Sequence, residues 1–101
     1  MSQFFKAAKL SDVPDGGMLA VDVNETAIAL TKVNDVVHAF GNVCTHDDGP
    51  LDEGTVAAGC VECPRHGARF DLKSGKGTFP AAAPIPIYQT KIDGEWVLVS
   101  L

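Results

Sequence analysis

The residues best suited to chemistry are two pairs of cysteine and histidine, Cys44-x-His46 and Cys63-x-x-His66. Each pair joins a thiol to an imidazole, and each is followed by a glycine within a few residues. Four such ligands could close a tetrahedral zinc site. They could also hold two irons, with the thiolates on one iron and the imidazoles on the other.

The spacing of the ligands helps to separate these two possibilities. One residue between Cys44 and His46 is fewer than paired zinc ligands usually have. Alternating cysteine and histidine on two matched loops suits a dinuclear centre, because each loop must then reach both irons. The pattern favours the dinuclear centre, with a zinc-binding structural module as the alternative from another class.

A third cysteine complicates the pattern, because Cys60-x-x-Cys63 is also the spacing of a thiol oxidoreductase. Such motifs need a βαβ setting, which the flanking sequence lacks. On a strand, the odd separation points the side chain of Cys60 away from that of Cys63. We therefore expect Cys63 to be the ligand and Cys60 to be a small buried residue of the core.

Length and charge limit the remaining possibilities. The 101 residues suffice for one domain, and a formal charge of -5 argues against a nucleic-acid surface and favours a partner with a basic docking face. The sequence contains no apolar run long enough for a signal peptide or a membrane span, so we expect a cytoplasmic protein. Since the number of cysteines is odd and the expected location is the cytoplasm, we do not expect a disulfide framework.

Short strands separated by turn residues predict an all-β fold. Three dipeptides, Asn24-Glu25, Asn34-Asp35 and Asp93-Gly94, stand where two-residue hairpin loops belong. A capped turn is expected at 11–14. The expected strands are residues 3–8, 18–23, 26–33, 36–40, 87–92 and 95–100.

The middle of the chain has a different texture, rich in turn dipeptides and containing all three cysteines. We interpret residues 41–80 as a smaller lobe inserted into an antiparallel base formed by residues 1–40 and 81–101. Together they would form a single domain, residues 1–101.

The two ligand segments, CTHDDGPLDEG and CPRHGARFDLKSG, closely resemble the cluster loops of Rieske-type ferredoxins. The similarity extends along the chain through DVPDGG, AFGNVCTH, PAAAPIPIY and KIDGEWVLV. It implies the Rieske fold and one 2Fe-2S cluster, with Cys44 and Cys63 on the inner iron and His46 and His66 on the outer iron.

The resemblance also implies a role without catalysis. Such a protein carries single electrons from a reductase, usually a flavoprotein, to the terminal non-haem iron oxygenase of a ring-hydroxylating system. A carrier that alternates between partners has reason to be a monomer. A rival within the same fold is the small subunit of a nitrite-reductase-type enzyme.

High-potential respiratory members of this family resemble one another in having a loop-to-loop disulfide and two hydroxyl donors near the cluster. Here the disulfide positions are Gly49 and Arg65, and the hydroxyl positions are Ala68 and Phe70. With fewer donors the reduced cluster is less stabilised, so we expect a potential near the low end of the Rieske range, about -150 mV.

Other residues have plainer explanations. We expect His38 to be structural, Trp96 and Tyr88 to be core residues, and Arg65 to be an exposed residue beside the centre that could contact a partner. The acidic residues at 47, 48, 52 and 53 could be a docking surface or a solvated loop. The proline-rich stretch at 80–86 could be a stiff connector or, by the resemblance, a third loop that covers the cluster.

Overall fold

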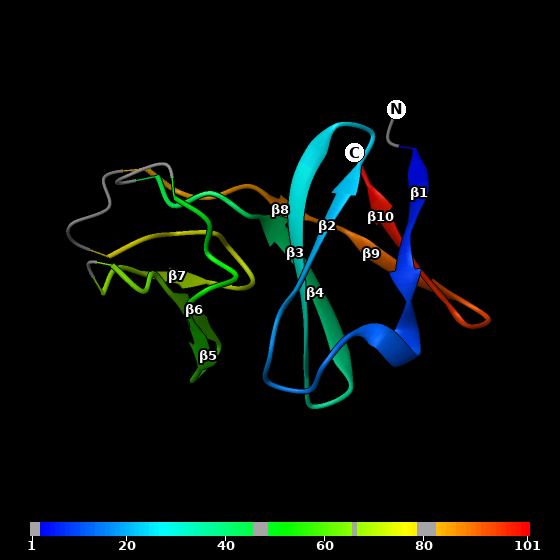
Figure 1. Cartoon of the computed structure of the whole chain (residues 1–101), viewed down its shortest axis with the longest axis horizontal. Coiled ribbons are helices and arrows are strands. Elements are labelled where there is room, and N and C mark those ends of the chain that lie inside the picture. The colour runs from blue at the N-terminus through cyan, green and yellow to red at the C-terminus, as the bar shows by residue number, and fades with distance from the viewer. Residues whose placement is uncertain (1–2, 46–48, 66, 79–82) are drawn as a thin grey trace.

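Ten strands in three antiparallel sheets build the computed structural model, which describes residues 3–45, 49–65, 67–78 and 83–101 (Figure 1). One short 3-10 turn, Leu10–Asp12, overlaps the expected capped turn at 11–14 and begins one residue earlier. The described part of the chain contains no helix that is long and apolar enough to cross a membrane. The strands are β1 (Phe4–Lys9), β2 (Leu19–Val23), β3 (Thr26–Val33), β4 (Val36–Gly41), β5 (Thr55–Ala57), β6 (Cys60–Glu62), β7 (Arg69–Asp71), β8 (Ile87–Tyr88), β9 (Thr90–Asp93) and β10 (Trp96–Ser100).

Two tight hairpins build the larger sheet, whose order is β2-β3-β4-β8. Asn24 and Glu25 join β2 to β3, and Asn34 and Asp35 join β3 to β4. All four residues have positive φ, which is the backbone of a type I′ turn and matches the right-handed twist of the flanking strands. The two predicted hairpin loops and the meander that they connect are confirmed.

The C-terminal segment differs from its prediction in two details. The expected strand at 87–92 is broken at Gln89, so that β8 pairs with β4 whereas β9 pairs with β10 in the other sheet. The carbonyl of Gln89 accepts a hydrogen bond from Ser100 at 2.9 Å, which marks the point where the chain changes sheets. The last turn lies one residue later than expected, at Gly94-Glu95, because Asp93 pairs with Trp96 and Gly94 has a positive φ.

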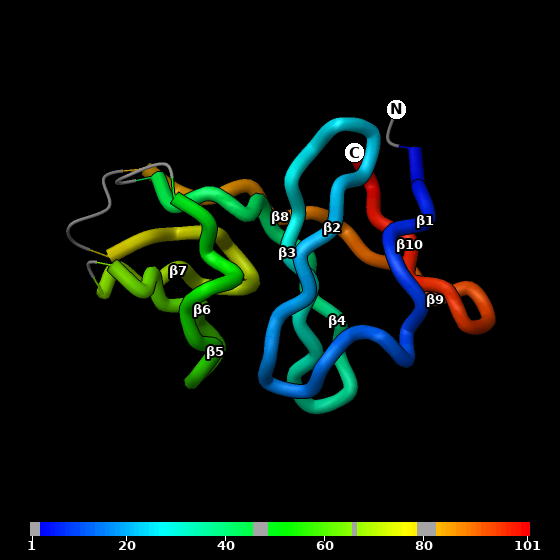
Figure 2. Tube along the Cα trace, in the orientation of Figure 1, coloured from blue at the N-terminus to red at the C-terminus, as the bar shows by residue number. Residues whose placement is uncertain are grey.

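The smallest sheet, β5-β6-β7, lies at one end of the molecule, away from the β1-β10-β9 sheet and both termini (Figure 1). The chain runs toward this end after β4 and returns from it before β8 (Figure 2). The outgoing and returning segments lie side by side, because the amide of Gly41 donates to the carbonyl of Pro86 at 2.9 Å. Residues 41–86 thus form an excursion that starts and ends at one place on the larger sheet.

Two groups of buried side chains hold these parts together. The first lies between the two larger sheets and includes Ile28, Leu30, Val97 and Val99. The second lies between the larger sheet and the excursion and consists of Ala29, Phe40, Cys44, Leu51, Val61, Cys63, Ala68, Phe70, Leu72 and Ile85. The second core therefore contains two of the three cysteines, Cys44 and Cys63.

Gly75 contacts the returning segment, and its replacement tests how much this contact contributes to stability. It has a φ of +80°, and its carbonyl accepts a hydrogen bond from Ile85 at 2.9 Å. A Cβ on Gly75 would overlap the carbonyl oxygen of Ile85, whereas a Cβ on Gly59, which also has positive φ, would meet open space. Gly59→Ala should cost only the backbone strain of about 1 to 2 kcal/mol.

We expect Gly75→Ala to cost clearly more than Gly59→Ala, by about 2 kcal/mol, because backbone atoms cannot move aside as a flexible side chain can. The free energy of unfolding in urea measures both. Equal losses for the two variants would show that the contact with Ile85 is relaxed at little cost.

Candidate metal centre

The thiols of Cys44 and Cys63 lie in the same apolar core, with exposed fractions of 0% and 1%. Cys44 follows β4 on the outgoing segment, and Cys63 follows β6 directly. Neither forms a disulfide, and neither does Cys60. The fold therefore brings together the two thiols that the sequence places on separate motifs.

The two cysteines begin loops that are closed in the same way. The amide of Cys44 donates to the carbonyl of Gly49 at 2.8 Å, and the amide of Cys63 donates to the carbonyl of Ala68 at 2.7 Å. In both cases the acceptor lies five residues after the cysteine. The second loop contains a further bond, from the amide of Gly67 to the carbonyl of Cys63 at 3.1 Å.

The two predicted histidine ligands lie outside the described residues, as do Asp47 and Asp48. In the sequence His46 falls between Cys44 and Gly49, and His66 falls between Cys63 and Ala68. Each closed loop thus contains one histidine. Their assignment as ligands stays a prediction.

The surroundings of the thiols indicate what they can bind. Leu51, Ala68, Phe70, Leu72 and Ile85 are all buried in the same core. A thiolate in such a place needs a cation beside it, since a lone charge is costly in apolar surroundings. Two buried thiols on adjoining loops therefore fit a soft metal centre, and a 2Fe-2S cluster is one that takes two thiolates on one iron.

Ala68 and Phe70 occupy the places where a hydroxyl donor would be expected in a high-potential relative. Both side chains are fully buried, and both belong to the core of Cys44 and Cys63. Neither side chain carries a hydroxyl group. The sequence alone shows that these two hydroxyl donors are missing. The structure adds that Ala68 and Phe70 lie in the core that contains the thiols.

Asn42 organises the first loop and was missed by the sequence analysis. Its side-chain oxygen accepts hydrogen bonds from the amides of Leu51 and Asp52, at 2.8 and 2.9 Å. Its side-chain nitrogen donates to the carboxylate of Asp52 at 2.9 Å. Its own amide donates to Ala27 of β3 at 3.1 Å, so the loop is tied to the larger sheet.

The returning segment also contacts the first loop. The hydroxyl of Thr45, the residue after Cys44, donates to the carbonyl of Ala83 at 2.6 Å. Ile85 is buried in the core that contains the thiols. The described end of the proline-rich stretch therefore lies against the centre, whereas the part at 80–82 lies outside the described residues.

Cys60 differs in part from its prediction. In β6, Val61 is buried and its neighbours Cys60 and Glu62 are half-buried, so Cys60 faces away from the core as expected. The prediction that Cys60 would be fully buried was wrong. Cys60 lines a pocket of about 200 Å³ on the β5-β6-β7 sheet, together with residues that include Glu62 and Arg69.

His38 lies in β4, opposite Thr31 of β3 and outside both ligand loops. Burial lowers the pKa of this imidazole, and the positive charge of Lys73 lowers it further, while Asp71 acts in the opposite direction. Asp71 is the last residue of β7, and Lys73 lies in the turn that follows it. These surroundings favour the neutral imidazole, in keeping with the structural role that we expected.

The acidic residues of the first loop that the structure describes have local partners. Asp52 accepts from Asn42, and Glu53 lies 3.7 Å from the guanidinium of Arg65. Arg65 is exposed, as expected for a contact residue; 30% of its side chain is accessible, and it donates to the carbonyl of Pro50 at 3.2 Å. The side chains of Asp52, Glu53 and Arg65 therefore make contacts within and between the two loops.

Comparison with known proteins adds an independent line. The family model described as Rieske [2Fe-2S] domain matches residues 3–89. A relative from Ralstonia sp., the ferredoxin component of naphthalene 1,2-dioxygenase/salicylate 5-hydroxylase systems, is 35% identical over 94% of this chain and 92% of its own. A 3-phenylpropionate/cinnamic acid dioxygenase ferredoxin subunit from Shigella boydii is 34% identical over 94% of this chain and 91% of its own.

Solved structures agree. The ferredoxin of carbazole 1,9a-dioxygenase from Nocardioides aromaticivorans superposes with a TM-score of 0.90 at 32% identity, covering 96% of both chains. A structure of reduced oxygenase in complex with oxidized ferredoxin from a carbazole 1,9a-dioxygenase contains a chain with a TM-score of 0.87 at 28% identity, covering 96% of this chain and 92% of that one. A nitrite reductase small subunit from Mycobacterium tuberculosis reaches 0.89 at 20% identity over 100% of this chain and 96% of its own, which shows a common fold alone.

We predict that Asn42→Ala will loosen the first loop by removing the acceptor for two amides. Leaving the amides of Leu51 and Asp52 without their partner should cost about 2 to 4 kcal/mol. Hydrogen exchange followed by NMR would show these two amides losing protection, with those of β3 as the internal reference. Unchanged protection at both amides would mean that Asn42 does not hold the loop.

Proposed function

The chain belongs to the Rieske 2Fe-2S domain family, and from this premise we propose that it is a ferredoxin that carries single electrons from a reductase to a terminal oxygenase. The observation that carries the proposal is the pair of loops, each closed by the amide of a cysteine, that bring the two thiols into one apolar core. When bound, a 2Fe-2S cluster supplies a one-electron redox couple.

The residues proposed to hold this cluster are Cys44 and Cys63 on the inner iron and His46 and His66 on the outer iron. A single cluster uses all four ligands. The buried cysteines anchor it to the protein interior, and the imidazoles would lie between the cluster and solvent. This order suits a carrier, because a partner that docks over the histidines comes close to the redox centre.

The proposed partners follow from the names of the relatives, which are ferredoxin components of dioxygenase systems. We propose a flavoprotein reductase as electron donor and a non-haem iron oxygenase as acceptor. The chain performs no catalysis of its own in this scheme. It would act as a single domain and a cytoplasmic monomer, which leaves one face free for successive partners.

The direct test is to purify the protein without oxygen and to measure iron, sulfide, zinc and the EPR spectrum after reduction. We expect two irons and two sulfides per chain and a rhombic signal. The reduced protein should then pass one electron per chain to the oxygenase of its own system. Colourless protein with stoichiometric zinc would instead support the structural module.

Replacing the cysteines one at a time tests the ligand assignment. Cys63→Ser should abolish assembly of the normal centre, because a buried hydroxyl is a poor substitute for a thiolate ligand. Cys60→Ser is the matched control from the same strand segment and should leave the visible spectrum nearly unchanged. Loss of the spectrum in Cys60→Ser would overturn the assignment.

The reduction potential tests the effect of the missing hydroxyl donors. We expect a midpoint near the low end of the Rieske range, about -150 mV. Phe70→Tyr should raise it by about 40 mV if the new hydroxyl donates one hydrogen bond worth about 1 kcal/mol more to the reduced state. Protein-film voltammetry measures both values, and a wild-type midpoint well above zero would contradict the expectation.

A further inference from the structure

Arg65 reaches from the second ligand loop to the first. One terminal nitrogen, Nη2, donates to the carbonyl of Pro50 at 3.2 Å, and the other, Nη1, lies 3.7 Å from a carboxylate oxygen of Glu53. The side chain starts between Cys63 and the next proposed ligand, and Pro50 and Glu53 both belong to the segment that follows Cys44. It therefore bridges the two loops that bring the thiols together.

Gly49 provides the surface on which the guanidinium lies. A Cβ at this position would overlap the guanidinium carbon of Arg65 and lie 2.7 Å from its Nε. Positive φ is not the reason for this glycine, because Gly49 is absent from the residues with left-handed backbone. Alanine at 49 thus meets an obstacle in Arg65, and its backbone is unstrained.

The position of Gly49 gives this contact its importance. Its carbonyl accepts the hydrogen bond from Cys44 that closes the first loop. The guanidinium of Arg65 packs against Gly49, which accepts this closing hydrogen bond. It also donates to the carbonyl of the next residue, Pro50. On the opposite side of the same segment, Asn42 holds Leu51 and Asp52.

We propose that Arg65 is a positioning residue that clasps the two ligand loops together over the metal centre, with Gly49 as its seat. This rests on the proposed function for the identity of the centre but adds a role that the four ligands do not supply. The clasp works through shape and through the hydrogen bond to Pro50 more than through its ion pair, since Glu53 is two-thirds exposed and such pairs contribute little.

Gly49→Ala provides a test that leaves Arg65 in the chain. The guanidinium is the far end of a flexible side chain, so the new methyl group should displace it without unfolding the loop. Arg65→Met removes the same contacts but also the charge. If the clasp is real, the two substitutions act on one interaction, and the double variant should be no worse than the more severe single variant.

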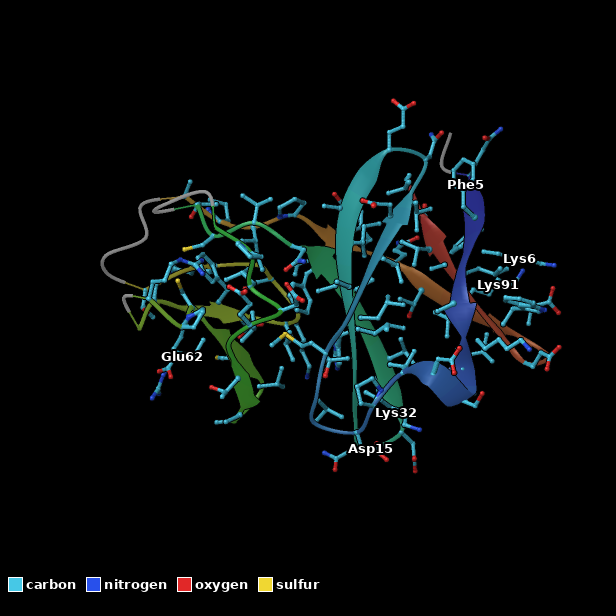
Figure 3. The ribbon with its side chains drawn as sticks, in the orientation of Figure 1. Phe5, Lys6, Asp15, Lys32, Glu62 and Lys91 are labelled. Carbon is cyan, nitrogen blue, oxygen red and sulfur yellow. The ribbon has the colours of Figure 1, made fainter. Side chains whose placement is uncertain are left out.

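Arg69→Met is the matched control. Arg69 donates to Glu62 at 3.1 Å on the β5-β6-β7 sheet, where Glu62 points outward at the end of the molecule opposite Lys6 and Lys91 (Figure 3). It is the other arginine of the excursion and forms an exposed ion pair between strands that the clasp does not touch. Its loss changes the net charge as Arg65→Met does.

The measurement is the rate at which the intact holoprotein loses its visible absorbance in excess iron chelator, with urea unfolding as the check on folding. We expect roughly fivefold to tenfold faster loss in Gly49→Ala and in Arg65→Met, no further acceleration in the double variant, and the wild-type rate in Arg69→Met. If Gly49→Ala and Arg65→Met fail to assemble a centre that Arg69→Met assembles, the clasp is supported in a stronger form.

Other outcomes separate the two proposals. Wild-type rates in Gly49→Ala, or effects that add in the double variant, would overturn the clasp while leaving the ferredoxin assignment intact. Acceleration in Arg65→Met alone would show that charge matters and would also overturn the clasp. Wild-type protein without iron would overturn the proposed function itself.

Discussion

The burial of two thiols in one apolar core is the constraint on which the remaining structure depends. Cys44 and Cys63 are far apart along the chain, and both must enter a volume from which water is excluded. Thiolates are stable there only with a metal cation, so the core that buries them also favours a metal that prefers soft ligands. The larger sheet supplies one wall through Ala29 and Phe40, and the excursion supplies the other.

Such a core requires loops that hold their shape without regular secondary structure. Three kinds of contact supply it: backbone closures at the two cysteines, side-chain bonds from Asn42, and the docking of the returning segment through Ile85. Arg65 and Gly49 add a contact between the loops themselves. Each contact arises from a different element, and the centre is therefore coupled to the fold at several points.

Sequence reasoning succeeded where local chemistry decides the structure. The hairpins at Asn24 and Asn34 could be located because left-handed residues are restricted to few amino acids. Ligand spacing singled out Cys44 and Cys63, and the fold buries both in one core, while their role as ligands stays a prediction. The break at Gln89 and the hydrogen bonds of Asn42 depend on partners distant in sequence, and no local pattern announces them. The contact between Gly49 and Arg65 also depends on a distant partner. A glycine in a loop usually indicates a turn, and nothing in the local sequence indicates that a guanidinium packs against it.

The equal span of the two backbone closures bears on the order of events during assembly. Each closure joins residues five positions apart, and contacts at such short range form much faster than those that link distant segments. The half-sites can therefore take shape while the sheets are still pairing. Two loops closed in this way would need little further ordering when they meet, which lowers the entropy cost of bringing the two thiols into one core.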